Sequence, residues 1–416
     1  MLTKIKKAAL IFGVLFSSST LAQKVKIDSS QVITLRIDPG DARGTSISDI
    51  FDEVEFIPLE SKKESVFGKI KQLEIAENRF VIFDEDTKNI FIFDRNGKFI
   101  AKINQGKINT IGKQEDQMFY GFQIRKVGSK SLITIQAGKS SVFFDLDGSL
   151  VKKEPANKKE WDIVYRFPGS GIVVRSNELI KSNMDSSYYE LVLYNSENRF
   201  LTAFFPFALN KIINDDLINS GKVFFDYGSS SEVFYTRYFE NNIYRIGEKK
   251  AELAYRFILP EKYSLPDGFI ENSSYKGKRM EYLMKNRDKF YGIFNTYTCG
   301  DNLFFNFSSF GFDRKAFIYN LKDNQLMSIG DLEPDALSSF LPVTDLGVLD
   351  EYKNRGFHLY QDGLLYNSYS SLAMFALNEQ NAEKKIKYNP VLTEYFRTQN
   401  KSSNPVIVRL KPKPKR

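Results

Sequence analysis

The stretch Asn78–Ile103, NRFVIFDEDTKNIFIFDRNGKFIAKI, decides the fold of this chain. An apolar run at Phe80–Phe83 is followed by a polar turn, a second run at Ile90–Phe93, an Asp-Arg-Asn-Gly turn at Asp94–Gly97 and a third apolar segment. Short apolar runs between turn residues predict antiparallel strands, because Asn-Gly supplies the positive φ of a tight hairpin. A chain that repeats such a meander several times is typically a β-propeller.

Six copies of this pattern follow one another at irregular intervals of about 40 to 70 residues, which indicates loop insertions. The sequence therefore predicts an all-β fold, a six-bladed β-propeller of four-stranded antiparallel blades. The predicted blades are Gly68–Gln105, Gly121–Asp145 with a return strand, Trp161–Phe205, Gly221–Phe257, Phe294–Ile329 and Leu346–Leu377, the last containing strands at Leu346–Leu349 and Ser371–Leu377.

Two segments depart from the strand pattern. Ser273–Phe294 has apolar residues at near-helical spacing, which predicts a helical insertion, and Pro390–Thr398 begins with the proline that favours a first helical turn. A propeller ring is commonly closed by strands from both chain ends, and Val54–Leu59 and Val406–Leu410 are the candidates. We expect one propeller domain over residues 23–410 and a solvated basic tail at 411–416.

The N-terminus predicts export. Three lysines precede the apolar stretch Ala8–Phe16, and small residues at Thr20 and Ala22 predict a signal-peptide cut between Ala22 and Gln23. The apolar stretch is too short to span a bilayer, so we expect no transmembrane segment in the mature chain. Because the only cysteine is Cys299, a lipid-modified N-terminal cysteine is excluded. We expect a periplasmic or extracellular protein that is not a lipoprotein.

The charge distribution gives no sign of a nucleic-acid partner. The formal net charge is +8, and removal of residues 1–22 with three lysines and no acids leaves +5. Lysines and acids are interspersed without a basic stripe, so this charge indicates a solvated surface. One cysteine forbids an internal disulfide, so the stability must come from the core, for which 37 Phe and 22 Tyr supply apolar area. We expect a monomer.

The chain resembles the exported bacterial "6-bladed beta-propeller" family, a group of unknown function that is distantly similar to NHL-repeat propellers. The resemblance covers essentially the whole mature chain and implies the fold and export, but no activity. Many relatives have a G-x-G-P-G-E turn where this chain has QGKINTIGKQEDQ at Gln105–Gln117, so any role of that loop does not carry over. The matching segments are DIFDEVEFIPLE (Asp49–Glu60), Gly68-Lys69-Ile70, RFVIFD (Arg79–Asp84), IFIFDRNGKFIAKI (Ile90–Ile103) and NPVIVRLK (Asn404–Lys411).

No catalytic constellation stands out, and we predict no cofactor and no metal site. Asp84 and Asp86 are spaced like the first ligands of a calcium loop, but Lys88 occupies the next ligand position, which favours a plain hairpin turn. One histidine, His358, and one cysteine cannot assemble a zinc site. Cys299 is interpreted as a buried, inert thiol; a nucleophile paired with His358 is the alternative.

The remaining function classes are binding and carbohydrate chemistry. We predict an exported, non-catalytic binding or interaction module whose partner is an envelope protein or a glycan. The alternative is a carboxylate-dependent carbohydrate-active enzyme of propeller fold, although the chain has no sialidase Asp-box and only one tryptophan, Trp161. A solvated helix face is the simpler interpretation of the basic residues in the insertion; docking of an acidic partner is the sharper one. Those residues are Lys276, Lys278, Arg279, Lys285, Arg287 and Lys289.

Overall fold

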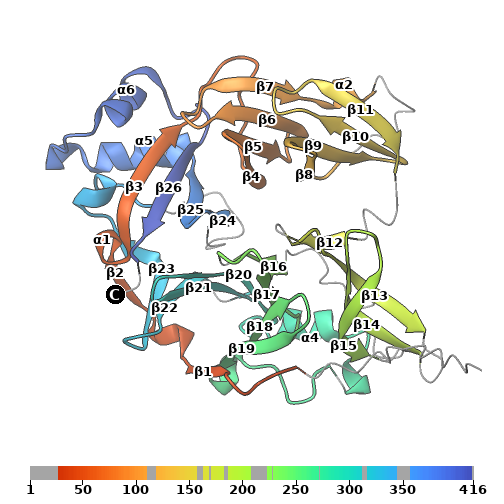
Figure 1. The fold of residues 1–416 in the computed structure, drawn as a ribbon. Coiled ribbons are helices and arrows are strands. Elements are labelled where there is room, and N and C mark those ends of the chain that lie inside the picture. The colour runs from red at the N-terminus through yellow and green to blue at the C-terminus, as the bar shows by residue number, and fades with distance from the viewer. Residues whose placement is uncertain are drawn as a thin grey trace, which may run out of the picture.

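Six small sheets are arranged as a ring in the computed structural model of the chain (Figure 1). The structure describes residues 27–109, 119–156, 163–167, 170–181, 186–207, 223–226, 228–270, 272–311, 316–343 and 357–414. Each sheet is one blade, and its strands follow one another in chain order from the middle of the ring outward, except that β1, β2 and β3 form the outer edges of three blades. The predicted six-bladed propeller is confirmed.

The first three blades each consist of four consecutive antiparallel strands. Blade 1 contains β4 (Gln72–Ala76), β5 (Arg79–Asp84), β6 (Asn89–Asp94) and β7 (Phe99–Ile103). Blade 2 contains β8 (Gln123–Val127), β9 (Lys130–Ala137), β10 (Ser140–Phe144) and β11 (Leu150–Pro155). Blade 3 contains β12 (Ile163–Arg166), β13 (Val173–Lys181), β14 (Ser186–Tyr194) and β15 (Phe200–Phe207).

The other three blades include strands from the N-terminal segment. Blade 4 contains β16 (Phe224–Phe225), β17 (Glu232–Thr236), β18 (Asn242–Gly247) and β19 (Ala251–Ile258), with β1 (Ile33–Arg36) outermost. Blade 5 contains β20 (Gly292–Cys299), β21 (Asn302–Ser308), β22 (Ala316–Asn320) and β23 (Gln325–Glu333), with β2 (Arg43–Ser46) outermost. Blade 6 contains β24 (Leu359–Gln361), β25 (Leu364–Tyr369), β26 (Val406–Pro412) and β3 (Phe51–Pro58).

The segment Asp28–Pro58, which we call the belt, therefore runs around the outer edges of three successive blades (Figure 1). Its first two strands pair in parallel with β19 and β23, so blades 4 and 5 have five strands and are not purely antiparallel, unlike the predicted blades. Gly44 allows the close approach of β2, because a Cβ there would lie 2.5 Å from the carbonyl oxygen of Asp331.

The belt also closes the ring. β3 pairs antiparallel with β26 from Pro58↔Val406 to Phe51↔Pro412, which confirms the predicted pairing of the two chain ends. Asn404 is fully buried beside this joint, where its side chain accepts from Phe67 N at 3.0 Å and donates to Glu60 O and Ser65 O.

A recurring turn connects the third and fourth strands of four blades. In each, an Asp or Asn side chain at the end of the third strand accepts hydrogen bonds from backbone N–H groups two to four residues later, as Asp94 does from Asn96 and Lys98 at 2.9 Å. This is the Asx turn that favours these residue types. The four turn residues are Asp94, Asp145, Asn195 and Asn320.

Aromatic and branched side chains fill the space between neighbouring sheets. Phe80, Phe83, Phe91 and Phe93 of blade 1 are at most 1% exposed, and they pack on both sides of their sheet. Antiparallel strands with both faces covered give continuous apolar runs, such as the RFVIFD segment. The prediction of a core rich in phenylalanine is confirmed.

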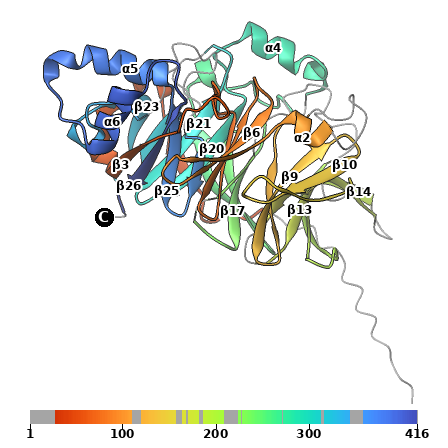
Figure 2. The same ribbon diagram turned by 90° about the horizontal axis from the view of Figure 1, so that it is seen from above.

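The helices differ more from the sequence-based prediction. Ser371–Leu377, expected as a strand, belongs to α5 (Ser371–Gln380), because Ser370 caps it by accepting from Ala373 N at 3.2 Å. The insertion expected near 273–294 contains the seven-residue helix α4 (Arg279–Lys285), which lies on one face of the ring (Figure 2). The predicted C-terminal helix is confirmed as α6 (Pro390–Thr398).

Several smaller elements and boundaries complete the description. The strand expected at Leu346–Leu349 lies outside the described residues. β26 continues through Pro412, two residues into the segment expected as a tail. The remaining helices within the described residues are α1 (Ile47–Ile50) and α2 (Gln105–Asn109), and the 3-10 turns there are η1 (Pro39–Asp41), η5 (Glu261–Tyr263), η6 (Ser273–Tyr275), η7 (Ala336–Ser338) and η8 (Ala382–Lys384).

Candidate functional site

The innermost strands bring polar and aromatic side chains together near the axis of the ring. β12, β16, β20 and β24 are the inner edges of blades 3 to 6 (Figure 1). A strand at the inner edge faces its counterparts in the neighbouring blades, and this is where propellers commonly form sites. The group, which we call the axial cluster, consists of Tyr165, Asp226, Tyr297, Cys299 and Tyr360.

A short hydrogen bond joins blades 3 and 4 within this cluster. Tyr165 donates its hydroxyl proton to Asp226 Oδ1 at 2.5 Å. The phenol ring stacks on Phe224, with centroids 5.3 Å apart and planes at 19°, which fixes the direction of the hydroxyl group. Burial and the Asp226 carboxylate raise the pKa of Tyr165 far above its usual range, so it stays protonated.

Carboxylates from two different blades affect the pKa of Tyr297. Its side chain is 3% exposed, and its pKa is raised by burial and then by the charges of Asp226 on blade 4 and Glu74 on blade 1. The ring packs edge-on against Phe225 at a centroid distance of 6.1 Å and tilts against Tyr360 at 5.4 Å. Tyr297 is therefore influenced by the charges of two carboxylates and packs against one other phenol, that of Tyr360.

Cys299, the next cluster member on β20, forms a hydrogen bond with Tyr360 of blade 6. Burial raises the pKa of the Cys299 thiol to about 12, and a hydrogen bond joins this thiol to the Tyr360 hydroxyl group. Burial and the neighbouring thiol also raise the pKa of Tyr360. A reactive cysteine needs a lowered pKa, so Cys299 is a protonated thiol at neutral pH. The prediction of a buried thiol is confirmed.

His358 has a different partner. Its Nε2 lies 2.8 Å from the Ser368 hydroxyl oxygen, in the neighbouring strand of the same blade. Cys299 bonds Tyr360 and His358 bonds Ser368, and the raised pKa of the thiol disfavours the nucleophilic alternative. Asp84, the first residue of the suspected calcium loop, accepts from the backbone N and the hydroxyl group of Thr87, as expected of a hairpin turn.

The axial cluster presents neutral hydroxyl groups beside carboxylates. At neutral pH its tyrosines and its thiol keep their protons, so they can donate and accept hydrogen bonds but do not act as nucleophiles. Within the described ranges, no three His, Cys, Asp or Glu side chains are grouped so that they could hold a metal ion. Tyr165 and Asp226 are half-buried, whereas Tyr297, Cys299 and Tyr360 are buried, so the first two are the groups that a polar ligand could reach.

A second polar cluster, between blades 3 and 4, is satisfied internally. Arg237 bonds Glu190 at 2.8 Å and also pairs with Glu240. Tyr235 donates to Glu190, and Tyr244 donates to Glu240 at 2.7 Å. Each charged group has a partner, as buried charges require, so this cluster joins two blades.

The basic residues of the insertion lie in different environments in the structure. Arg279 is 4% exposed and donates to the carbonyl oxygens of Phe269 and Ile270, so it holds a loop and does not face a partner. Lys285 pairs with Glu281 at 2.6 Å, and Arg287 and Lys289 donate to backbone carbonyls. Lys276 and Lys278 are exposed.

Sequence reasoning missed the axial cluster, although a usable signal exists. Its members lie on or beside the first strand of their blades, and the first strand of a blade is the innermost one. A tyrosine or aspartate on several first strands therefore marks convergence at the axis. The signal is weak from sequence because β16 has only two residues and β24 only three.

The signal peptide and the absence of a membrane-spanning segment are the subject of two further predictions. The signal-peptide cut between Ala22 and Gln23 lies outside the described residues, as does Trp161. None of the helices in the described ranges has the length and apolarity needed to cross a bilayer.

A comparison with solved structures supports the fold. The "Putative exported protein" of Bacteroides fragilis NCTC 9343 has a similar structure, with a TM-score of 0.56 and 16% identity, over 92% of this chain and 99% of that one. A DUF4221 member from Bacteroides vulgatus ATCC 8482 matches with a TM-score of 0.41 and 10% identity, over 87% and 99% of the two chains. A search of curated proteins finds no match.

The family resemblance expected from the motifs is confirmed by a family model. That model is the domain of unknown function DUF4934, and it matches residues 31–411, which run from just before β1 to the penultimate residue of β26. The chain therefore belongs to the DUF4934 family and is a six-bladed β-propeller.

Proposed function

We propose that this protein is exported and acts as a binding module whose axial cluster recognises a polar ligand without transforming it. The observation that supports this most is the protonation state of the cluster. Tyr165, Tyr297 and Tyr360 have raised pKa values, and the pKa of Cys299 rises to about 12, so the inner strands present hydrogen-bonding groups and no activated nucleophile.

Export is supported by the leader sequence before Gln23 and by the name of the similar Bacteroides fragilis protein. Cleavage after Ala22 and delivery to the periplasm or the cell exterior are parts of the proposal. The intact mass of the protein isolated from the envelope tests the cut, because retention of residues 1–22 would contradict it.

A screen for ligands tests the binding function. The mature chain is mixed with glycans, peptidoglycan fragments, peptides and divalent ions, and its melting temperature is measured. A ligand of the native state raises this temperature by mass action. The variants Asp226→Asn and Tyr297→Phe should abolish the shift for an axial ligand. Asp147→Asn is the matched control, because Asp147 is exposed in the turn between β10 and β11, the two outer strands of blade 2. A shift that survives both axial variants would place the ligand elsewhere.

The second candidate function is a carboxylate-dependent carbohydrate-active enzyme. It is favoured by one observation, namely that Glu74 and Asp226 come from opposite blades and both act on Tyr297. Glycosidases use such a pair of carboxylates on either side of the scissile bond. Turnover of a glycan that binds, lost in both Glu74→Gln and Asp226→Asn, would establish the enzyme. Binding without turnover supports the module.

A protein partner at the insertion remains part of the proposal. Lys276, Lys278, Lys285 and Arg287 are exposed, and the Met284 side chain between them is 57% exposed. An acidic partner would be attracted there. The double variant Lys285→Glu with Arg287→Glu should weaken capture of such a partner, and unchanged capture would remove this surface from consideration.

A further inference from the structure

A groove lies at the outer rim, far from the axial cluster, where the belt passes from blade 4 to blade 5. Its volume is about 430 Å³, and it is bounded by the end of β1, the start of β2 and the turn between β22 and β23. Small-molecule sites typically enclose about 300 to 1,000 Å³. The volume is therefore sufficient for a small ligand. The residues that matter here are Arg36, Asp41, Arg43, Tyr319, Asn324 and Gln325.

Two exposed arginines line this groove. Arg36 ends β1 and Arg43 begins β2, and neither guanidinium bonds a carboxylate or a carbonyl among the residues that the structure describes. The nearby Asp38 is already neutralised, because it pairs with Lys262 at 3.3 Å and accepts from Gly40 N at 2.8 Å. An arginine presents five N–H donors in a planar fork that matches a carboxylate.

Neutral groups on the blade 5 side add further donors. Tyr319 is 6% exposed and donates its hydroxyl proton to Asn324 Oδ1 at 3.2 Å. This bond leaves the amide N–H₂ group of Asn324 to donate elsewhere. Burial raises the pKa of Tyr319, so the phenol keeps its proton. Gln325 is exposed at the edge of the groove and adds a second amide.

One acceptor accompanies these donors. Asp41 is exposed, lines the groove and has no partner within the described part of the chain. A simple inorganic anion gains nothing from a carboxylate, whereas a ligand with hydroxyl groups can donate to it. The lining therefore fits a molecule that combines a carboxylate with several hydroxyl groups.

We propose that this rim groove binds an acidic sugar, with Arg36 and Arg43 on its carboxylate and with Asp41 and the two amides on its hydroxyl groups. The site goes beyond the axial function and does not depend on it. The sugar is either a free uronic acid or one unit of an acidic glycan, because the groove is open to solvent at the edge of the ring.

Calorimetric titration with galacturonic acid tests the proposal. Galactose serves as the neutral counterpart, trigalacturonic acid tests a unit within a chain, and a short peptide with a free C-terminal carboxylate tests the competing class. We expect galacturonic acid to bind and galactose to bind far more weakly. Added salt should lower the affinity for galacturonic acid. Tighter binding of the trimer identifies a glycan as the source, and equal binding identifies the free acid.

The variant Arg36→Gln with Arg43→Gln should weaken acid binding about tenfold or more, since both cations that would bond the carboxylate are removed. The control Arg199→Gln with Arg397→Gln removes the same charge from exposed positions on blade 3 and α6. Tyr297→Phe should leave this binding unchanged, which separates it from the axial function.

Three results would overturn the proposal. Galacturonic acid and its trimer could both fail to bind at millimolar concentration, the control pair could weaken binding as much as the groove pair, or the peptide could bind more tightly and lose affinity in the groove variant. The last result would assign the groove to peptide carboxylates. The groove variant should retain its melting temperature, because both side chains are exposed.

Discussion

Single residues decide whether two blades can meet, and Gly97 is the clearest example. It has a φ of +81° in the turn between β6 and β7, and a Cβ there would lie 2.1 Å from the carbonyl oxygen of Pro58 in β3. Glycine is therefore required for two independent reasons, the left-handed backbone and the close approach of the closing strand. The Asn-Gly pair that indicated a hairpin in the sequence also positions the ring closure.

We expect Gly97→Ala to lower the free energy of unfolding by about 2 to 4 kcal/mol, from the strained φ and the overpacked contact. The matched control is Gly363→Ala, which has a similar φ of +76° but nothing within 4 Å of a new Cβ. The control should lose only about 1 kcal/mol. Urea denaturation measures both, and equal losses would show that the contact with Pro58 has no cost.

Cys299 gives the protein a characteristic loss of stability in alkali. Its pKa is about 12 in the folded protein, against an ordinary value of 9.0. Between these values the unfolded thiol has lost its proton and the native thiol has not, so the unfolded state binds fewer protons and the free energy of unfolding falls as pH rises. We expect Cys299→Ala to reduce this slope between about pH 9 and pH 12.

The slope is measured by denaturation at several pH values in that window. Tyrosines with raised pKa values add to it in both proteins, so the difference between wild type and variant reports the thiol together with its effect on the pKa values of Tyr297 and Tyr360. An identical slope would mean that the thiol is accessible to water. Labelling with iodoacetamide gives an independent check, because a buried, protonated thiol reacts only after unfolding.

At the scale of elements, the belt shows how a strand can be added to the outside of a blade. β2 approaches β23 so closely that only glycine fits at position 44, where a Cβ would meet the Asp331 carbonyl oxygen at 2.5 Å. We expect Gly44→Ala to release β1 and β2 from the rim, at a cost of about 1 to 3 kcal/mol. Gly68→Ala is the control, because nothing lies within 4 Å of its Cβ.

Hydrogen exchange distinguishes local release from general destabilisation. In the Gly44 variant, amides of residues 33–46 should exchange faster while blades 1 to 3 keep their protection. Uniformly faster exchange, or no faster exchange, would contradict the view that the belt is a separate outer layer.

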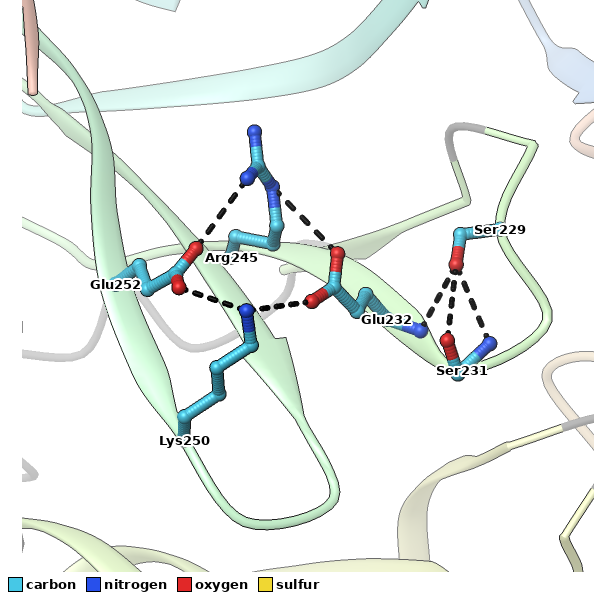
Figure 3. A network of polar contacts seen from close by, with 6 residues as sticks. All are labelled: Ser229, Ser231, Glu232, Arg245, Lys250 and Glu252. Atoms are coloured by element: carbon cyan, nitrogen blue, oxygen red, sulfur yellow. Dashed lines mark hydrogen bonds and ion pairs between the residues drawn. The ribbon is translucent and has the colours of Figure 1, made fainter. Parts of the chain in front are cut away.

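A cluster of charged side chains on blade 4 should contribute little to the free energy of unfolding, because its ion pairs are partly exposed to solvent. It joins Glu232, Arg245, Lys250 and Glu252 at 2.7 to 3.8 Å near the start of the belt (Figure 3).

Elements also show where sequence patterns are reliable. Blade 1 was predictable because its apolar runs alternate with Asx turns, and each of these signals is local. The segment Ser371–Leu377 was misassigned because its residues suit both a strand and a buried helix, and the deciding feature was the cap provided by Ser370. β1 and β2 could not be foreseen as blade strands, since each has only four residues and β2, with the sequence RGTS, has no apolar pattern.

For the whole molecule, the ring makes distant parts depend on each other. β3 and β26 pair across almost the full length of the chain, and Asn404 links the joint to the loop before blade 1 through three side-chain hydrogen bonds. The fold and its closure were predictable because both chain ends carry apolar strand patterns. The axial cluster was not, because convergence at an axis depends on the orientation of six sheets.

We expect Asn404→Ala to lower the stability of the entire ring by about 2 to 4 kcal/mol, because buried backbone groups of Glu60, Ser65 and Phe67 lose their partner. Thermal unfolding should remain a single transition at a lower temperature. Asn78→Ala, at an exposed turn, should have little effect. A second transition in the Asn404 variant would show that blades unfold independently of the closure.

The belt also has a consequence for how the chain matures. Residues 28–58 leave the ribosome before the first strand of blade 1, yet the strands that they pair with, β19, β23 and β26, are made progressively later and end at Pro412. The belt is thus synthesised before its partners, and its last strand stays unpaired until β26 has been made. Synthesis of β26, more than any local event, is therefore the step that allows the ring to close.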